Sequence, residues 1–137
     1  TLSLHDALPI YGDCSCFAAD SAVAAATTMK GSGWGADKLE SLSDAICLHM
    51  NGHVDLSKGA EAHLLQQAAA YDIVGSRYYD LHSKYRESIL HKYPRENINR
   101  DFVKFIANEK KLNPNSRAAL MHNVGLPLMV KLNPYSE

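Results

Sequence analysis

The residue whose surroundings point most directly to chemistry is Asp72. It lies in an apolar run, 68–74, that reads Ala-Ala-Ala-Tyr-Asp-Ile-Val, so we expect its carboxylate to be buried. It also lies near the predicted end of a helix, where the negative end of the helix dipole repels a carboxylate. Because both effects disfavour the ion by several kcal/mol, a cation must compensate it. A metal ion and an arginine such as Arg77 are the two candidates for that cation.

Histidines supply a second kind of candidate. His49 interrupts an otherwise apolar helical stripe, so we expect it to point inward. A neutral imidazole there needs a hydrogen-bond partner or a metal, and a hydrogen-bonded core histidine is the simpler interpretation. His5 and Asp6 place an imidazole and a carboxylate side by side. With a distant buried aspartate, such nitrogen and oxygen ligands suit Zn, Mn or Fe.

Other histidines have plainer explanations. His53 lies in a glycine-containing loop, where a functional and a structural role are both open. Three more lie in polar or helix-terminal positions, where we expect solvated or capping roles: His82, His91 and His122.

The elements that must position these residues are predicted to be helices. Apolar residues recur at helical spacing, while period-two alternation typical of strands is hard to find. Ser57 is expected to cap the third helix, and Asn97 the fifth. The expected helices cover residues 17–29, 36–50, 58–74, 83–92, 98–111, 115–123 and 127–132.

Two of these helices carry the candidate residues on defined faces. In 36–50, one face holds Leu39, Leu42, Ile46, His49 and Met50. In 58–74, the 4-3-4 spacing places Glu61, Leu65, Ala68 and Asp72 together. The predicted fold class is therefore all-α, a compact multi-helix bundle.

Composition limits the class of protein. The chain has 137 residues, 46% of them apolar and 21% charged, which is typical of one globular domain. The net charge is −1, whereas proteins that bind nucleic acids or anionic membranes usually carry a net positive charge. Neither partner is therefore predicted. No apolar run approaches the ~20 residues that span a bilayer. Three cysteines form no disulfide framework, so a reduced, cytoplasmic location is expected.

Several segments, taken in order, resemble a known family. They are Cys-Phe-Ala-Ala-Asp-Ser-Ala at 16–22, Asp-Ala-Ile-Cys-Leu-His-Met-Asn at 44–51, Glu-Ala-His-Leu-Leu at 61–65 and Ala-Ala-Ala-Tyr-Asp-Ile-Val-Gly at 68–75, with weaker matches at 102–105 and 116–120. Their order and spacing resemble the HD-domain superfamily of metal-dependent hydrolases, and within it the bacterial proteins related to cyanamide hydratase. The resemblance covers nearly all of the chain from about Gly12 onward.

The resemblance implies a metal site and a reaction. Such proteins hold one divalent metal (Zn, Fe or Mn) through an early histidine, a His-Asp doublet and a late aspartate. Carried over, the doublet is His5 and Asp6 and the late ligand is Asp72, while the early histidine lies outside this chain. His49 matches an inward histidine that approaches the metal-bound water or the substrate, so it is the expected catalytic residue. The implied reaction is attack of metal-activated water on a small nitrile or phosphoester substrate.

The same resemblance divides the chain. Residues 1–11 are expected to be a non-native or disordered segment, and 12–137 an HD-like helical domain that is incomplete at its N-terminus. Two alternatives remain open. One is a degenerate, non-catalytic HD module that binds a small ligand or a protein partner. The other is an ordinary helical domain in which Arg77 or a backbone donor pairs with Asp72.

Overall fold

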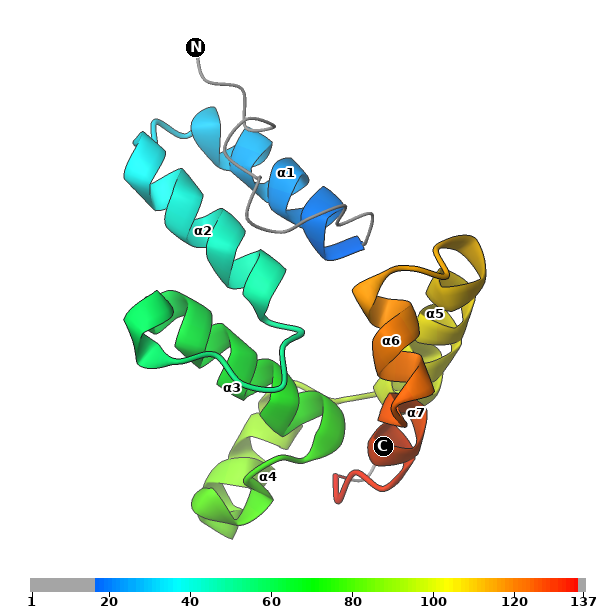
Figure 1. Cartoon of the computed structure of the whole chain (residues 1–137). Coiled ribbons are helices and arrows are strands. Elements are labelled where there is room, and N and C mark those ends of the chain that lie inside the picture. Colours follow the sequence, from blue (N-terminus) through cyan, green and yellow to red (C-terminus); the bar gives the residue numbers. More distant parts are fainter. Residues whose placement is uncertain (1–16, 136–137) are drawn as a thin grey trace.

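The computed structural model describes residues 17–135, and this part of the chain is all-α, as predicted (Figure 1). It contains no strand. The expectations for residues 1–11 lie outside the described part. The helices are α1 (Phe17–Lys30), α2 (Ala36–Leu48), α3 (Ala60–Val74), α4 (Ser83–Lys92), α5 (Ile98–Leu112), α6 (Arg117–Asn123) and α7 (Leu126–Lys131), with 3₁₀ turns η2 (Leu56–Lys58) and η3 (Tyr78–Asp80).

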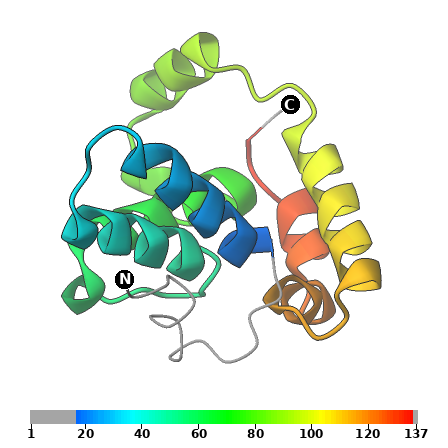
Figure 2. The same ribbon diagram turned by 90° about the horizontal axis from the view of Figure 1, so that it is seen from above.

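The helices form two groups that meet through α3. In the first group α1 packs on α2, and α2 packs on α3. In the second, α5, α6 and α7 pack on one another, and α7 also contacts α3. Helix α4 has no buried residue and lies apart from both groups (Figure 2). The end of α3 is therefore where the two groups and the segment leading to α4 come together.

Small side chains let the first group pack closely. Ala18, Ala22 and Ala26 recur every four residues on α1 and are almost fully buried. Residues at this spacing share one helix face, so the α1 backbone can approach α2 closely. Because the buried residues of α1 are alanines, each of them contributes little buried apolar area.

A core cluster in the second group connects the two groups. Its members are Ile106, Ala118, Leu126 and Val130. Side chains from the first group pack against this cluster, among them Phe17, Met50, Ile73 and Val74. The ends of α2 and α3 are thus held against the same apolar surface.

The helix ends lie within two residues of the predicted positions, but the predicted N-cap of α3 is wrong. Ser57 does not cap it. Instead Asp55 caps η2, with its Oδ1 accepting a hydrogen bond from the Ser57 N–H at 2.8 Å. Helix α3 begins after Gly59, whose φ of +107° is costly for residues with a Cβ. Asn97 does occupy the N-cap position of α5, although its side chain makes no capping hydrogen bond.

The faces that the spacing defines on α2 and α3 are not the most buried faces of these helices: the α2 set is partly buried and the α3 set is exposed. On α2 the buried residues are Ser43, Ala45, Cys47 and Leu48, because this helix is covered on two sides, by α1 and α3. On α3 the buried residues are Ala62 and Gln66, whereas Leu65, on the predicted face, is 40% exposed. Helical spacing therefore grouped the residues correctly without showing which group packs inward.

Candidate functional site at the end of helix α3

Helix α3 ends in a tight turn against the C-terminal segment. Gly75 takes the left-handed conformation, with φ +68° and ψ 22°, and the N–H groups of Gly75 and Ser76 both donate to the Ala70 carbonyl. A Cβ at position 75 would overlap the ring of Pro134. Glycine is thus required both for the turn and for the close approach of the two segments.

Asp72 is not buried, contrary to the prediction. Its side chain is 54% exposed, and its cation is Arg95 rather than Arg77. Arg77 pairs instead with Asp80, at 2.6 Å, and also donates to the Gln67 side-chain oxygen. The apolar run led to a wrong prediction because only some of its residues pack inward. Ile73 and Val74 pack against the core cluster of the second group, while Asp72 lies on the more exposed side of α3.

Arg95 compensates the negative end of α3. Only 4% of its side chain is exposed, and Nη1 donates to the Asp72 carboxylate and, at 2.9 Å, to the Asp72 carbonyl. Nη2 donates to Asn99 Oδ1 at 2.6 Å. A buried cation at a helix C-terminus offsets both the dipole and the carboxylate. Arg95 Nε is buried without a hydrogen-bond partner among the described residues.

A second side chain completes the cap. Asn133 Nδ2 donates to the carbonyls of Asp72, at 2.7 Å, and Ile73, at 3.0 Å. Its Oδ1 accepts the Tyr135 N–H at 2.9 Å. Two of the carbonyls that the end of α3 leaves unpaired are therefore bonded to side chains distant in sequence.

Beside this cap is an open cavity of about 570 Å³. Asp72 and Tyr71 of α3 contribute to its wall, as does Ile89 of α4. The Tyr71 hydroxyl is buried without a partner among the described residues. Its ring lies 5.5 Å from that of Tyr135, whose pKa is raised by burial and further by the neighbouring Tyr71. The volume suits a small organic molecule.

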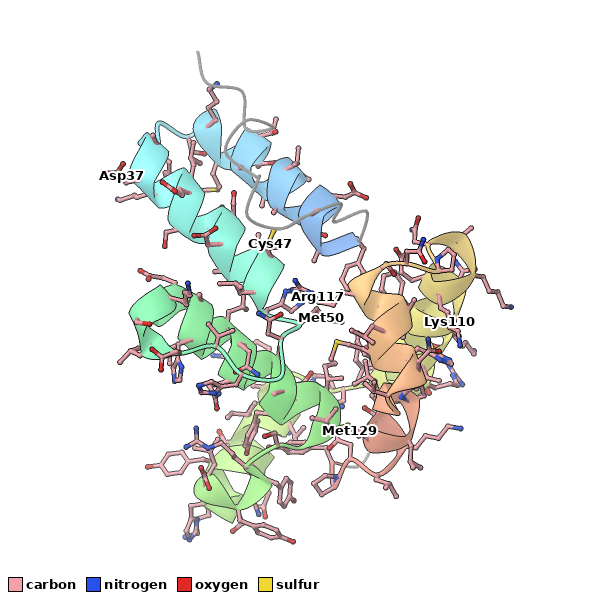
Figure 3. The ribbon with its side chains drawn as sticks, in the orientation of Figure 1. Asp37, Cys47, Met50, Lys110, Arg117 and Met129 are labelled. Atoms are coloured by element: carbon pink, nitrogen blue, oxygen red, sulfur yellow. The ribbon has the colours of Figure 1, made fainter. Side chains whose placement is uncertain are left out.

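His49 lies at the C-cap of α2 and is half-buried. Its Nδ1 is hydrogen-bonded to the Ile46 carbonyl, and the ring lies edge-on to Phe17 with centroids 6.5 Å apart. This geometry agrees with the simpler interpretation, a histidine satisfied by a hydrogen bond. Nearby, Arg117 reaches from α6 toward the end of α2 and donates to the Cys47 carbonyl at 2.8 Å (Figure 3).

The structure places the segments of His49 and Asp72 against the same core cluster, although no hydrogen bond or ion pair joins the two side chains. Met50 and Ile73, the next residue in each case, pack against the same core cluster. His5 and Asp6, the predicted doublet, lie outside the described part of the chain. Across residues 17–135 no group of three histidine, cysteine, aspartate or glutamate side chains converges.

Two of the other histidines are hydrogen-bonded to the backbone. His82 caps α4, with Nδ1 accepting from the Lys84 N–H at 3.3 Å, as the prediction of a capping role requires. His63 Nδ1 is hydrogen-bonded to the Val54 carbonyl at 2.7 Å, and its ring lies 6.4 Å from that of His53. The pKa of nearby Asp55 is lowered, first by its hydrogen bonds to Ser57 and then by the two histidines.

Sequence reasoning did not find Arg95, Asn133 or Tyr135. Arg95 lies 23 residues from Asp72, and Asn133 lies 61 residues from it. No local pattern connects such positions, because each residue lies in an irregular segment without helical periodicity. The one available signal was the need of Asp72 for a cation, which does not specify which arginine supplies it.

Comparisons with known proteins do not assign a family: no protein-family model, curated protein or solved structure matches this chain. No helix within residues 17–135 is both long and apolar enough to cross a membrane.

Proposed function

We propose that the protein is a metal-dependent hydrolase or hydratase of the HD superfamily, acting on a small nitrile or phosphoester. Asp72 is its late metal ligand, and His49 contacts the substrate or moves a proton. The metal is Zn, Fe or Mn, and its other ligands come from outside residues 17–135, with His5 and Asp6 as the sequence-based assignment. We place the protein in the cytoplasm, with a small-molecule substrate and no nucleic-acid partner.

One observation carries this proposal: the Asp72 carboxylate faces a cavity instead of the core. The side chain is half-exposed and lines a space of about 570 Å³. Arg95 bonds Oδ1, and no described residue is hydrogen-bonded to Oδ2. One oxygen of a fixed carboxylate is therefore open for a ligand, as a metal or substrate site requires.

A matched pair of variants tests the proposal. Asp72→Asn removes the ligand charge, whereas Asp80→Asn removes the same charge from a residue that lines the same cavity and pairs with Arg77. We expect Asp72→Asn to weaken binding of Zn²⁺ or Mn²⁺ at least tenfold in isothermal titration calorimetry, with Asp80→Asn close to the parent. Hydrolysis of p-nitrophenyl phosphate and hydration of cyanamide are measured alongside. Equal metal affinity in the parent and Asp72→Asn contradicts the proposal.

A second candidate function is a non-catalytic helical module that binds a small ligand or a protein. The apolar character of the cavity wall favours it, with Leu64 of α3 64% exposed and Ile89 of α4 47% exposed. The engagement of Asp72 by Arg95 favours it too. In this case Ile89→Ser lowers the fluorescence of bound anilinonaphthalene sulfonate, while Val23→Ser on α1 does not. Metal binding that is unaffected by Asp72→Asn, together with this loss of dye binding, selects the module over the hydrolase.

A further inference from the structure

Two histidine side chains lie together at the start of α3, at the opposite end of this helix from Asp72. His53 lies in the loop that follows α2, and His63 is the fourth residue of α3. Their ring centres are 6.4 Å apart, and the ring planes are at 83° to each other. Nine positions of helix separate His63 from Asp72, which corresponds to roughly 14 Å along the axis. The pair is therefore distinct from the site at the end of α3.

His63 is held in the way that metal-ligating histidines are held. Its Nδ1 lies 2.7 Å from the Val54 carbonyl oxygen, and because a carbonyl only accepts, Nδ1 is the donor. In the neutral ring the free lone pair is then on Nε2. Histidines that bind metals usually donate their other ring N–H to a carbonyl or a carboxylate, which fixes the tautomer and the orientation of the ring.

The segment that carries His53 is fastened on both sides of this residue. Gln66, which is 2% exposed, donates to the carbonyls of Asn51, at 3.1 Å, and Gly52, at 3.3 Å. On the other side, Val54 is 3% exposed and belongs to a core cluster that it shares with residues of α2 and α3. The backbone around position 53 is therefore held against α3, while the exposed side chain of His53 can rotate.

The spacing of the two rings suits a single metal ion. Metal–nitrogen distances of about 2.0–2.1 Å at a tetrahedral angle place the centres of two ligating imidazoles about 5 Å apart. The observed 6.4 Å exceeds this by about 1.4 Å, a distance that rotation of the His53 side chain can close.

An acidic side chain close to both rings favours a bound cation. The pKa of Asp55 is lowered, first by its hydrogen bonds to Ser57 and to a smaller extent by His53 and His63. The Asp55 carboxylate is therefore near enough to both rings to interact with a positive charge held between them.

We infer that His53 and His63 together bind one divalent transition-metal ion, with water completing its coordination. Imidazole nitrogen suits Ni²⁺, Cu²⁺ and Zn²⁺, whereas Mg²⁺ and Ca²⁺ prefer oxygen ligands. The ion joins the loop before α3 to the helix itself, and it stabilises the folded chain by mass action. The inference does not depend on the proposed hydrolase, because it uses neither Asp72 nor His49.

Calorimetric titration with Ni²⁺ tests the pair. We expect His53→Ala and His63→Ala each to lower the affinity at least tenfold, because loss of a ligand's hydrogen-bond partner alone costs roughly 10–100-fold. His91→Ala is the matched control, since it removes an imidazole from an exposed position of α4. His53→Ala keeps the bond between His63 and Val54, so it decides the test if His63→Ala does not fold. Asp72→Asn is expected to bind Ni²⁺ like the parent.

The outcomes separate the pair from other ways of binding the ion. Loss of affinity in His53→Ala, with His91→Ala and Asp72→Asn both close to the parent, supports the inference. Equal affinity in the parent and His53→Ala overturns it, as does the absence of binding at 1 mM Ni²⁺. Equal losses in His53→Ala and His91→Ala overturn it too, since the histidines then act as independent weak ligands. A loss confined to Asp72→Asn assigns the ion to the end of α3, which overturns this inference and supports the proposed hydrolase.

Discussion

Replacement of Arg95 by methionine tests how helix α3 is stabilised at its end. Methionine keeps much of the volume of this side chain, which is only 4% exposed, and removes the guanidinium. We expect the free energy of unfolding to fall by about 2 kcal/mol, because the bonds of Arg95 outweigh the cost of its unpartnered Nε.

The magnitude follows from the partners of Arg95. Its bonds to the Asp72 carbonyl and to Asn99 Oδ1 are charge-assisted and contribute about 1.5 kcal/mol each. Its pair with the half-exposed Asp72 carboxylate contributes at most about 1 kcal/mol. Against these terms, methionine relieves the buried, unpartnered Nε, which is worth about 1–2 kcal/mol. The Asp72 carbonyl keeps its bond from Asn133, which limits the loss.

Urea unfolding followed by circular dichroism at 222 nm measures the effect. With a slope of about 1.5 kcal/mol/M, a loss of about 2 kcal/mol moves the midpoint by about 1.3 M. Asp72→Asn is the matched comparison, because the asparagine still offers an oxygen to Arg95 and leaves the carbonyl and Asn99 bonds intact. It also removes an anion from the negative end of α3, which returns about 0.3–1 kcal/mol. We expect its cost to stay below about 1 kcal/mol.

The comparison can refute the reasoning. If Asp72→Asn destabilises the protein as much as Arg95→Met, the ion pair stabilises this region and capping of the α3 carbonyl does not. If Arg95→Met leaves the free energy of unfolding unchanged, the cost of desolvating the guanidinium equals the stabilisation from its hydrogen bonds and ion pair. The buried arginine then has no net stabilising role. A small cost for Asp72→Asn also makes that variant a clean probe of metal binding.

Two further changes test the contacts of the C-terminal segment. Gly75→Ala combines a positive φ with a Cβ that overlaps Pro134, so we expect a loss of more than about 2 kcal/mol, against about 1 kcal/mol for Gly33→Ala, whose φ of +78° is similar but whose Cβ meets nothing. Similar costs in urea unfolding contradict the close approach. Because burial raises the pKa of Tyr135, the folded protein keeps that proton when the unfolded chain loses it near pH 10, and stability falls as the pH rises above that value. The urea midpoint between pH 8.5 and pH 11 then falls less steeply in Tyr135→Phe than in the parent, while Tyr79→Phe, at an 88% exposed residue, behaves like the parent. Parallel curves for all three proteins contradict the shift.

The helices were predictable because their signals are local. The prediction for 83–92 matches α4 at both ends, and the other helix ends lie within two residues of their predicted positions. His82 was expected either to be solvated or to cap a helix, and it caps α4. Such features depend on residues within one turn of each other, so the sequence order is enough to determine them.

Packing partners were not predictable. The spacing on α3 grouped Leu65 with Asp72, but that group is the exposed one, since Ala62 and Gln66 face inward. Alanine-rich helices such as α3 have apolar residues on every side, so periodicity does not show which side is covered. The need of Asp72 for a cation was foreseen, whereas its exposure and its partner were not.

By itself the sequence determined that this chain is helical and where its helices begin and end, and it predicted that Asp72 has a positive partner. The tertiary structure decided that Arg95 is that partner and that Asn133 caps the same helix end. It also decided that the rings of His53 and His63, ten positions apart in the sequence, are neighbours. The physical reason is that capping and periodicity act over a few residues, whereas ion pairs, buried hydrogen bonds and local potential depend on distances in space that only the folded chain establishes.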